Sequence, residues 1–294
     1  MRKIKVGIIG TGNIGTDLLL KLKRSDILEC GMFTGRSVDS KGIAIAKELG
    51  VPTSTKSIQA IQEDPDCCDI VFDATSANAH KRNALILKEL GKLSIDLTPS
   101  RIGRMCVPVL NMEECLGETE VNLITCGGQA TTPIAYAISR IHPETKYVEI
   151  VATIASKSAG KGTRDNIDEF TQTTRDALTE FTGIKNTKAI IILNPAEPPI
   201  TMHNTIYALI DNPDMDAITA AVIDMENAIR KYVPGYRIVM PPTFENGRVT
   251  TTLQVIGLGD YLPRYSGNLD IITCAAVEVA ESYAKKKLGG ALYE

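Results

Sequence analysis

A glycine-rich segment near the N-terminus constrains the fold of this chain more than any other feature. The β-branched run from Lys5 to Ile9 is followed by Gly10-Thr11-Gly12-Asn13-Ile14-Gly15 and then by a leucine-rich stretch from Asp17 to Lys23. This order of strand, GxGxxG and helix allows a tight turn and lets a pyrophosphate approach the helix N-terminus, where amides and dipole favour its charge. The segment therefore predicts a dinucleotide-binding fold.

Strand-like and helix-like segments continue to alternate through the first half of the chain. Strands fit Ile27 to Thr34, Ile70 to Ala74 and Leu93 to Leu97, and helices fit Lys41 to Leu49 and Ala79 to Leu90. Alternation of this kind predicts a parallel, doubly wound sheet of the Rossmann type.

Polar residues follow two of these strands and bear on cofactor choice. Thr75 and Ser76 either contact a cofactor at the carboxyl edge of the sheet or cap a helix. An NAD-selective fold usually carries an acidic residue after its second strand, whereas this chain has Arg36 there. Arg36 is either a partner for a 2′-phosphate or an exposed loop arginine, so NADP stays open beside NAD.

The composition limits the class of protein. A chain of 294 residues with 44% hydrophobic residues can form two domains. A net charge of −3 gives no general attraction to nucleic acid or membranes, and no apolar stretch is long enough to span a bilayer. We expect a cytoplasmic protein with small-molecule partners. Seven cysteines without a CxxC pair or a His/Cys cluster predict neither a metal site nor a disulfide framework.

The second half has the pattern of an α+β domain with a mixed or antiparallel sheet. Its expected strands are Tyr147 to Ala155, Ala189 to Leu193, Thr205 to Ile210 and Val249 to Ile256, and its expected helices are Asn166 to Phe181, Asp214 to Tyr232 and Cys274 to Leu288. We expect the last helix to pack on the first domain. The overall fold class is then α/β, a doubly wound domain joined to a mixed-sheet domain.

One cysteine stands where thiol chemistry is expected. Cys126, followed by Gly127 and Gly128, separates a strand-like segment, Val121 to Thr125, from a helix-like one, Gln129 to Ile141. The positive end of a helix and its unsatisfied amides stabilise a thiolate and lower the cysteine pKa. The same amides can hold an oxyanion on a carbonyl substrate. A buried cysteine before a glycine turn is the alternative.

Two later segments carry donors suited to a cofactor. Ser156 to Asn166 contains two glycines and several donors, and it is either a cradle for a nucleotide or a loop that ends in a helix cap. Asn268 precedes the last expected helix, where it either donates to a carboxamide or caps that helix.

These segments, taken in order, closely resemble the acylating acetaldehyde dehydrogenases, the partners of 4-hydroxy-2-oxovalerate aldolase in aromatic catabolism. The resemblance rests on the glycine loop, Cys126 to Thr131, Ser158 to Asn166, Asn194 to Pro199 and Tyr261 to Asp270. It implies an acyl-thioester on Cys126. It also implies cofactor contacts at Thr11, Gly12, Asn13 and Ile14, at Ser158, Ala159, Gly160, Lys161, Gly162, Thr163, Arg164, Asp165 and Asn166, and at Asn268.

The resemblance further implies the reaction and the assembly. Acetaldehyde, or another short aldehyde, would react with coenzyme A and NAD to give acetyl-CoA and NADH. The chain would form a homodimer within a hetero-oligomer that contains the aldolase. Residues 1–125 with 270–294 would form the dinucleotide-binding domain, and residues 126–269 the catalytic and dimerisation domain.

The sequence departs from this family at a site that bears on the cysteine, and also at Lys161, where a proline is usual. His203-Asn204-Thr205 stands where the family carries Arg-Asp-Thr, whose carboxylate is thought to help activate the cysteine. Asn204 cannot act as a base, and His203 should point to the opposite face of its strand. We therefore expect activation of Cys126 to depend on the helix terminus. The alternatives are a phosphorylating or semialdehyde dehydrogenase of the same plan and a non-catalytic NAD-binding subunit.

Overall fold

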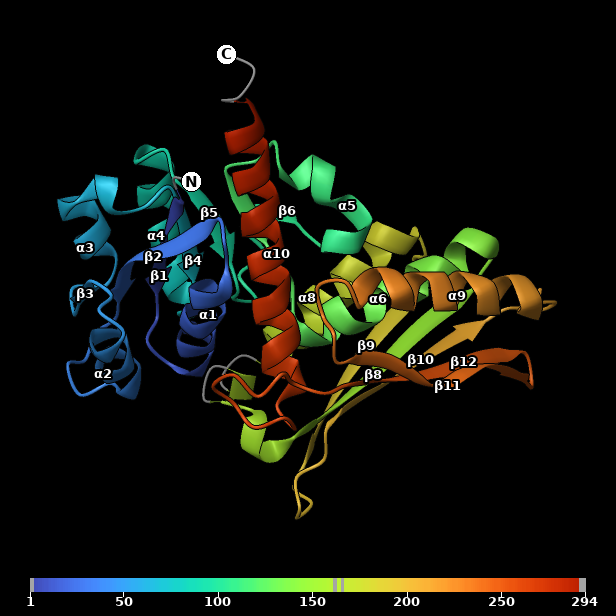
Figure 1. The fold of residues 1–294 in the computed structure, drawn as a ribbon. Helices are drawn as coiled ribbons and strands as arrows, with labels where there is room; N and C mark the ends of the chain where they lie inside the picture. The colour runs from blue at the N-terminus through green and yellow to red at the C-terminus, as the bar shows by residue number, and fades with distance from the viewer. Residues whose placement is uncertain (1–2, 161–162, 165–166, 291–294) are drawn as a thin grey trace. The chain divides into compact units, whose positions relative to one another are not determined.

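The computed structural model describes residues 3–160, 163–164 and 167–290, and it divides into two compact units (Figure 1). The first unit takes the described residues up to Leu123, then Asp260–Leu262 and those from Thr273 onward. The second takes Ile124–Gly259 and Pro263–Ile272. Among the described residues, no helix has the length and apolar character needed to cross a membrane.

The first unit is built on a parallel sheet, as the alternating pattern predicts. Its strands are β1 (Ile4–Ile9), β2 (Leu28–Thr34), β3 (Thr53–Ser54), β4 (Ile70–Asp73), β5 (Leu93–Asp96), β6 (Arg104–Met105) and β7 (Glu120–Asn122). Over the described residues their order is β3-β2-β1-β4-β5-β7-β6, and each pairing is parallel. Sheets of this kind bind ligands outside the carboxyl ends of the strands where the order reverses, which here lies between β1 and β4.

Helices join these strands and bury the sheet. They are α1 (Asn13–Arg24), α2 (Lys41–Glu48), α3 (Ile58–Glu63), the short η1 (Pro65–Cys67), α4 (Ala77–Glu89) and α5 (Pro108–Cys115). The last helix, α10 (Gly267–Gly290), begins seven residues earlier than the sequence pattern predicts. Its later part packs on this unit, as expected, because Thr273 donates to Asp17 at 2.6 Å and Ser25 donates to Glu281 at 2.6 Å.

The second unit contains a mixed sheet with helices on one face (Figure 1). Its strands are β8 (Tyr147–Ala155), β9 (Thr187–Asn194), β10 (Met202–Leu209), β11 (Tyr236–Glu245) and β12 (Arg248–Val255), in the order β11-β12-β10-β8-β9. Only the β8–β9 pair is parallel among the described pairings of this sheet. The helices are α6 (Cys126–Ile141), α8 (Ile167–Thr182) and α9 (Met215–Ile229), and the short η2 (Ser156–Ser158) follows β8.

The sequence pattern missed strand β11. This strand contains Pro241 and Pro242, which cannot donate to a ladder, and the register with β12 shifts around them. Proline is tolerated in a sheet at edge strands, and β11 is an edge of this one.

Candidate active site

The glycine loop of the first unit forms a cradle for an anion. Gly10 has a φ of +116°, and a Cβ built there would lie 2.4 Å from the carbonyl oxygen of Ala74. A Cβ on Gly15 would lie 1.8 Å from the carbonyl oxygen of Gly10. Gly12 is the N-cap of α1 and supplies no side-chain cap, so the amides of the first turn stay open to a ligand. A dinucleotide pyrophosphate fits this arrangement.

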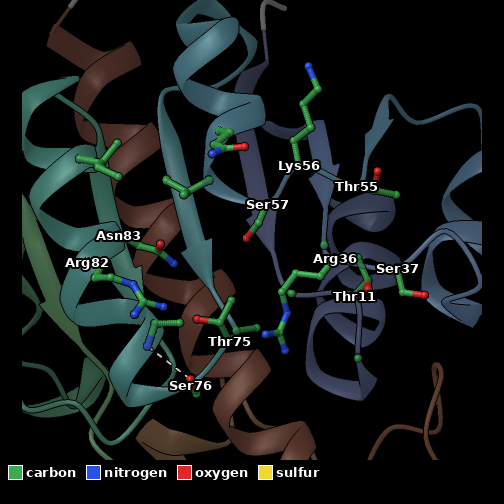
Figure 2. Close-up of a pocket in the computed structure, with 18 residues that line it drawn as sticks. Thr11, Arg36, Ser37, Thr55, Lys56, Ser57, Thr75, Ser76, Arg82 and Asn83 are labelled. Carbon is green, nitrogen blue, oxygen red and sulfur yellow. Dashed lines mark hydrogen bonds between the residues drawn. The ribbon is translucent and has the colours of Figure 1, made fainter.

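A cavity of about 720 Å³ lies beside this loop in the first unit (Figure 2). This volume is within the usual range for small-molecule sites. Thr11 and Gly12 line the cavity, as the sequence predicts, whereas Asn13 and Ile14 begin α1 and are not among its lining residues. The loop after β2 also lines it through Arg36. A cofactor of dinucleotide size therefore has a preformed place on this unit.

Of the two polar residues after β4, Ser76 is a helix cap, and cofactor contact by either residue stays a prediction. Ser76 caps α4 by accepting the backbone N–H of Ala79 at 3.3 Å, and Thr75 donates its hydroxyl proton to Asp73. Both residues also line the cavity. Sequence reasoning missed two further cations of the lining, Lys56 in the loop after β3 and Arg82 in the middle of α4. These two segments are far apart in the sequence, and no local pattern indicates that they line one cavity.

The candidate nucleophile of the second unit is the first residue of a helix. Helix α6 begins at Cys126, three residues before the predicted start, so Gly127 and Gly128 lie inside the helix rather than in a turn before it. Thr125 is the N-cap and accepts the backbone N–H of Gly128 at 2.9 Å. Ile124, just before the cap, has a φ of +54°, a strained conformation for a β-branched residue. Such strain is concentrated at functional sites.

Close packing explains why glycine follows the cysteine. A Cβ on Gly127 would lie 2.8 Å from the ring of Phe170 and 3.2 Å from the Cβ of Ala152. A Cβ on Gly128 would lie 2.7 Å from the side chain of Ile124. The two glycines therefore let the start of α6 press against its neighbours, which fixes the position of Cys126.

The expectation of a lowered pKa for Cys126 is wrong. Burial raises the pKa of its thiol to about 12, although the backbone amides of Gly127 and of Cys126 itself oppose this shift. Loss of hydration raises the pKa by more than the amides and the helix dipole lower it. The sulfur is removed from water, although the residue as a whole is partly exposed. At neutral pH the unliganded protein thus holds a thiol rather than a thiolate.

This correction gives a prediction for alkylation. Since only the thiolate reacts, the rate at which iodoacetamide modifies Cys126 should rise about tenfold per pH unit, with no plateau below about pH 10. Peptide mass spectrometry of timed samples measures the rate at this residue. A plateau between pH 6 and 8 would mean that the thiol is already ionised there.

The residues that follow Met202 on β10 point to opposite faces, as expected. His203 lies on the open face, where its Nδ1 bonds the carbonyl oxygen of Thr201 at 3.0 Å. Asn204 is fully buried on the face covered by the helices and pairs in register with Ala152, the residue packed under Gly127. Neither amide atom of Asn204 has a hydrogen-bond partner among the described residues. His203 therefore does not replace the missing carboxylate, and Asn204 carries an unsatisfied polar group towards the helices.

A leucine at position 204 should stabilise the fold. Leu has the same branching as Asn, and Asn204→Leu removes two buried polar atoms without partners, so we expect the free energy of unfolding to rise by about 1–3 kcal/mol. Urea denaturation measures this change. Asn122→Leu is the matched control, because Asn122 is equally buried but donates to Asp96 at 2.7 Å and Thr98 at 2.9 Å. The control should lose stability. A loss in Asn204→Leu as well would show that Asn204 is satisfied in solution.

The second predicted cofactor segment meets Asn268 within the second unit. The side-chain amide of Asn268 donates to the carbonyl oxygen of Ser158 through a long bond of 3.5 Å, and its Oδ1 is buried without a partner among the described residues. Helix α10 starts at Gly267, so the alternative that Asn268 caps it is wrong. A buried acceptor of this kind fits the amide of a nicotinamide carboxamide.

The rest of that segment is only partly visible. Arg164 donates to Ser156 at 2.8 Å and to Ala159 at 3.2 Å, so its guanidinium closes its own loop. Gly160 and Thr163 lie within the described residues beside it. Lys161, Gly162, Asp165 and Asn166 lie outside the described residues.

Fold and site together define a class of protein. A doubly wound unit with a glycine cradle and a second unit with a mixed sheet form the plan of a dinucleotide-dependent oxidoreductase. Residues 5–115 match the family described as semialdehyde dehydrogenase, NAD binding domain. Residues 126–263 match the family described as prokaryotic acetaldehyde dehydrogenase, dimerisation.

Full-length relatives give the narrower assignment. The chain is 54% identical over 290 residues to the acetaldehyde dehydrogenase of Pectobacterium atrosepticum and 55% identical over 290 residues to that of Geobacillus stearothermophilus, with 98% of each chain covered. It is 49% identical over 284 residues to that of Spirochaeta aurantia, covering 97% of this chain and 96% of the relative. The chain belongs to the acetaldehyde dehydrogenase family. It is an NAD-dependent aldehyde dehydrogenase.

Proposed function

We propose that the chain is the coenzyme A-acylating form of acetaldehyde dehydrogenase. It would convert acetaldehyde, coenzyme A and NAD to acetyl-CoA and NADH through a thioester on Cys126. The observation that carries this proposal is the place of Cys126 at the start of α6, where the amides of Cys126 and Gly127 face its sulfur. A nucleophile and two donors for an oxyanion are what acyl transfer requires.

The chain's own residues supply most of the steps. When the aldehyde binds, the Cys126 thiol gives its proton to solvent water and Sγ bonds the carbonyl carbon, while the oxygen takes the charge against the amides of Cys126 and Gly127. When bound, NAD would supply the acceptor for the hydride of this carbon. The carbonyl re-forms as a thioester, the thiolate of coenzyme A attacks it, and Cys126 Sγ leaves with its electron pair. Exclusion of water during the thioester stage prevents hydrolysis to acetate.

The acyl acceptor is tested by adding it separately. Aldehyde-dependent NADH formation should be sustained with coenzyme A and should stop after about one turnover without it. Mass spectrometry of the stalled protein should then show one acetyl group on the peptide that contains Cys126. Sustained turnover with inorganic phosphate in place of coenzyme A would favour the phosphorylating alternative, which the semialdehyde dehydrogenase match of residues 5–115 brings into consideration. No reduction of NAD under any condition would favour a non-catalytic subunit.

A homodimer formed through the second unit is also part of the proposal. It is supported by the description of the matching family and by the face of the mixed sheet opposite the helices, where Ile192 is 43% exposed and Leu209 is 38% exposed. Sedimentation should show a dimer for the native chain and a monomer for Ile192→Glu with Leu209→Glu. Ile223→Glu, an equally apolar and exposed position on α9, should remain dimeric. A dimer in the double variant would count against this interface.

The cellular setting follows from the same family resemblance. We place the chain in the cytoplasm, in a complex with 4-hydroxy-2-oxovalerate aldolase that supplies a short aldehyde during aromatic catabolism. All seven cysteines are free, and Cys67 and Cys68 keep their sulfurs 3.7 Å apart without a bond, in keeping with a reducing compartment. Co-purification of the two chains at a fixed ratio tests the complex.

A further inference from the structure

We propose that the cofactor cavity of the first unit carries a subsite for a 2′-phosphate, so that this chain binds 2′-phosphorylated dinucleotides as well as NAD. This inference rests on the use of a dinucleotide and not on the identity of the acyl acceptor. It starts from the charge of the cavity lining, which includes Arg36, Lys56 and Arg82 and contains no aspartate or glutamate among the described residues.

The missing carboxylate removes the usual basis for rejecting a phosphate. In NAD-selective folds an acidic residue after the second strand binds the ribose 2′-hydroxyl and repels a 2′-phosphate. Here β2 ends at Thr34, and Gly35, Arg36 and Ser37 follow. A Cβ on Gly35 would lie 2.6 Å from the side chain of Thr11, so this loop is held against the glycine cradle. Arg36 thus occupies the position at which the ribose is recognised.

Two arginines are available to a phosphate, and the lysine is not. Figure 2 shows the guanidinium groups of Arg36 and Arg82 entering the cavity from the β2 side and the α4 side, whereas Lys56 points away from them. Lys56 is also paired with Glu63 at 2.6 Å. Within the described part of the chain, the side chains of Arg36 and Arg82 have no hydrogen bond or ion pair. Unpaired guanidinium groups are the preferred partners of phosphate, which they bind through paired N–H donors.

Ser37, the residue after Arg36, adds a neutral donor to the cavity lining. Its Oγ accepts the backbone N–H of Asp39 at 3.3 Å, which leaves its own hydroxyl proton free for a ligand oxygen. The subsite would therefore consist of the Arg36 guanidinium, the Ser37 hydroxyl and, from the opposite wall, the Arg82 guanidinium.

Nucleotide fragments test the subsite without the catalytic reaction. Calorimetric titration of the full chain should show that adenosine 2′,5′-bisphosphate binds about tenfold or more tightly than 5′-AMP, since charged hydrogen bonds to one phosphate are worth at least that ratio. In Arg36→Ala the ratio should fall severalfold, because only Arg82 then remains as a cation of the subsite. In Arg36→Asp, 5′-AMP should bind more tightly than adenosine 2′,5′-bisphosphate. The ratio of kcat/KM for NADP to that for NAD should fall in the same variants.

Lys81→Ala is the matched control, because Lys81 is exposed on α4 next to Arg82 but does not line the cavity. It should leave the binding ratio unchanged. Equal loss in Lys81→Ala and Arg36→Ala would show general charge attraction only and would overturn the subsite. So would equal affinities for the two nucleotides in the native chain. If neither nucleotide binds, the cavity is not a cofactor site. If the nucleotide affinity ratio is as expected but coenzyme A does not sustain turnover, only the acylation proposal is refuted.

Discussion

Replacing Cys126 with alanine is expected to reduce aldehyde-dependent NADH formation by on the order of 10⁴-fold or more, because removal of a covalent nucleophile leaves only binding and oxyanion stabilisation. The structure supports this expectation through the placement of the sulfur against the amides of Cys126 and Gly127 at the start of α6. Because the backbone fixes these amides, Cys126→Ala should leave the fold intact. Initial rates at saturating aldehyde, coenzyme A and NAD measure the effect.

Cys30 provides the matched control. Like Cys126 it is partly exposed, and burial raises the pKa of its thiol to about 12 as well. It lies within strand β2 rather than at the start of a helix. Cys30→Ala should therefore keep its activity within about threefold of the native value, a normal effect for a substitution away from the site. Comparable losses in the two variants would mean that Cys126 has a structural role, and the thioester mechanism would have to be abandoned.

The parts of this molecule that the sequence predicted are those in which local pattern and tertiary structure agree. The glycine loop, the parallel sheet and strand β8 follow from backbone sterics and hydrophobic periodicity, which act over a few residues. Strand β11 was missed because Pro241 and Pro242 break the pattern, and only its edge position makes them tolerable. The left-handed conformation of Ile124 could not be predicted, since nothing local favours it in a β-branched residue.

The candidate site shows the same division more sharply. The position of Cys126 at a helix start is a local property, and the sequence located it to within a turn. Its pKa is a property of the surroundings, because burial in the folded unit decides how much water the sulfur keeps. Arg82 reaches the cofactor cavity only because α4 packs on the parallel sheet, against β5, so no motif marks it. The sequence therefore predicted site residues that a short segment places, such as Cys126, and missed residues that tertiary packing brings to the site, such as Arg82.

A buried cluster of charges behind the cofactor cavity gives the largest expected change in stability. His80 of α4 is fully buried, and its Nδ1 lies 2.9 Å from Asp73 while its Nε2 lies 3.1 Å from Glu120 and 3.5 Å from Asp96. Burial alone would lower the pKa of His80, but the hydrogen bonds that His80 donates to Asp73 and Glu120, together with the charge of Asp96, raise it to about 10. The imidazolium at neutral pH therefore holds three carboxylates together beneath Thr75, a residue of the cavity.

Removing this one cation leaves the carboxylates uncompensated, so His80→Leu should lower the free energy of unfolding by about 3–5 kcal/mol at pH 7. Urea denaturation of the native chain and the variant measures the difference. His203→Leu is the control, because His203 is partly exposed and bonds only neutral groups, Thr201 and Gln254, and it should cost about 1 kcal/mol or less. Equal losses of unfolding free energy in the two variants would mean that the charge of His80 does not stabilise the fold through the three carboxylates.

The pH dependence separates charge from packing as the source of this loss. The folded pKa of His80, about 10, lies above its ordinary value of 6.5, so the stability that it contributes is complete below pH 6.5 and is lost as the pH rises towards 10. Burial also raises the pKa of Asp96 to about 6, against the opposing charge of His80, and removal of that charge should raise it further. In His80→Leu, Asp96 can therefore take up a proton at a higher pH than in the native chain, which relieves its buried charge as the pH falls. The stability gap between native and variant should be widest near pH 7 and should narrow at both lower and higher pH, whereas a gap caused by lost packing would be the same throughout.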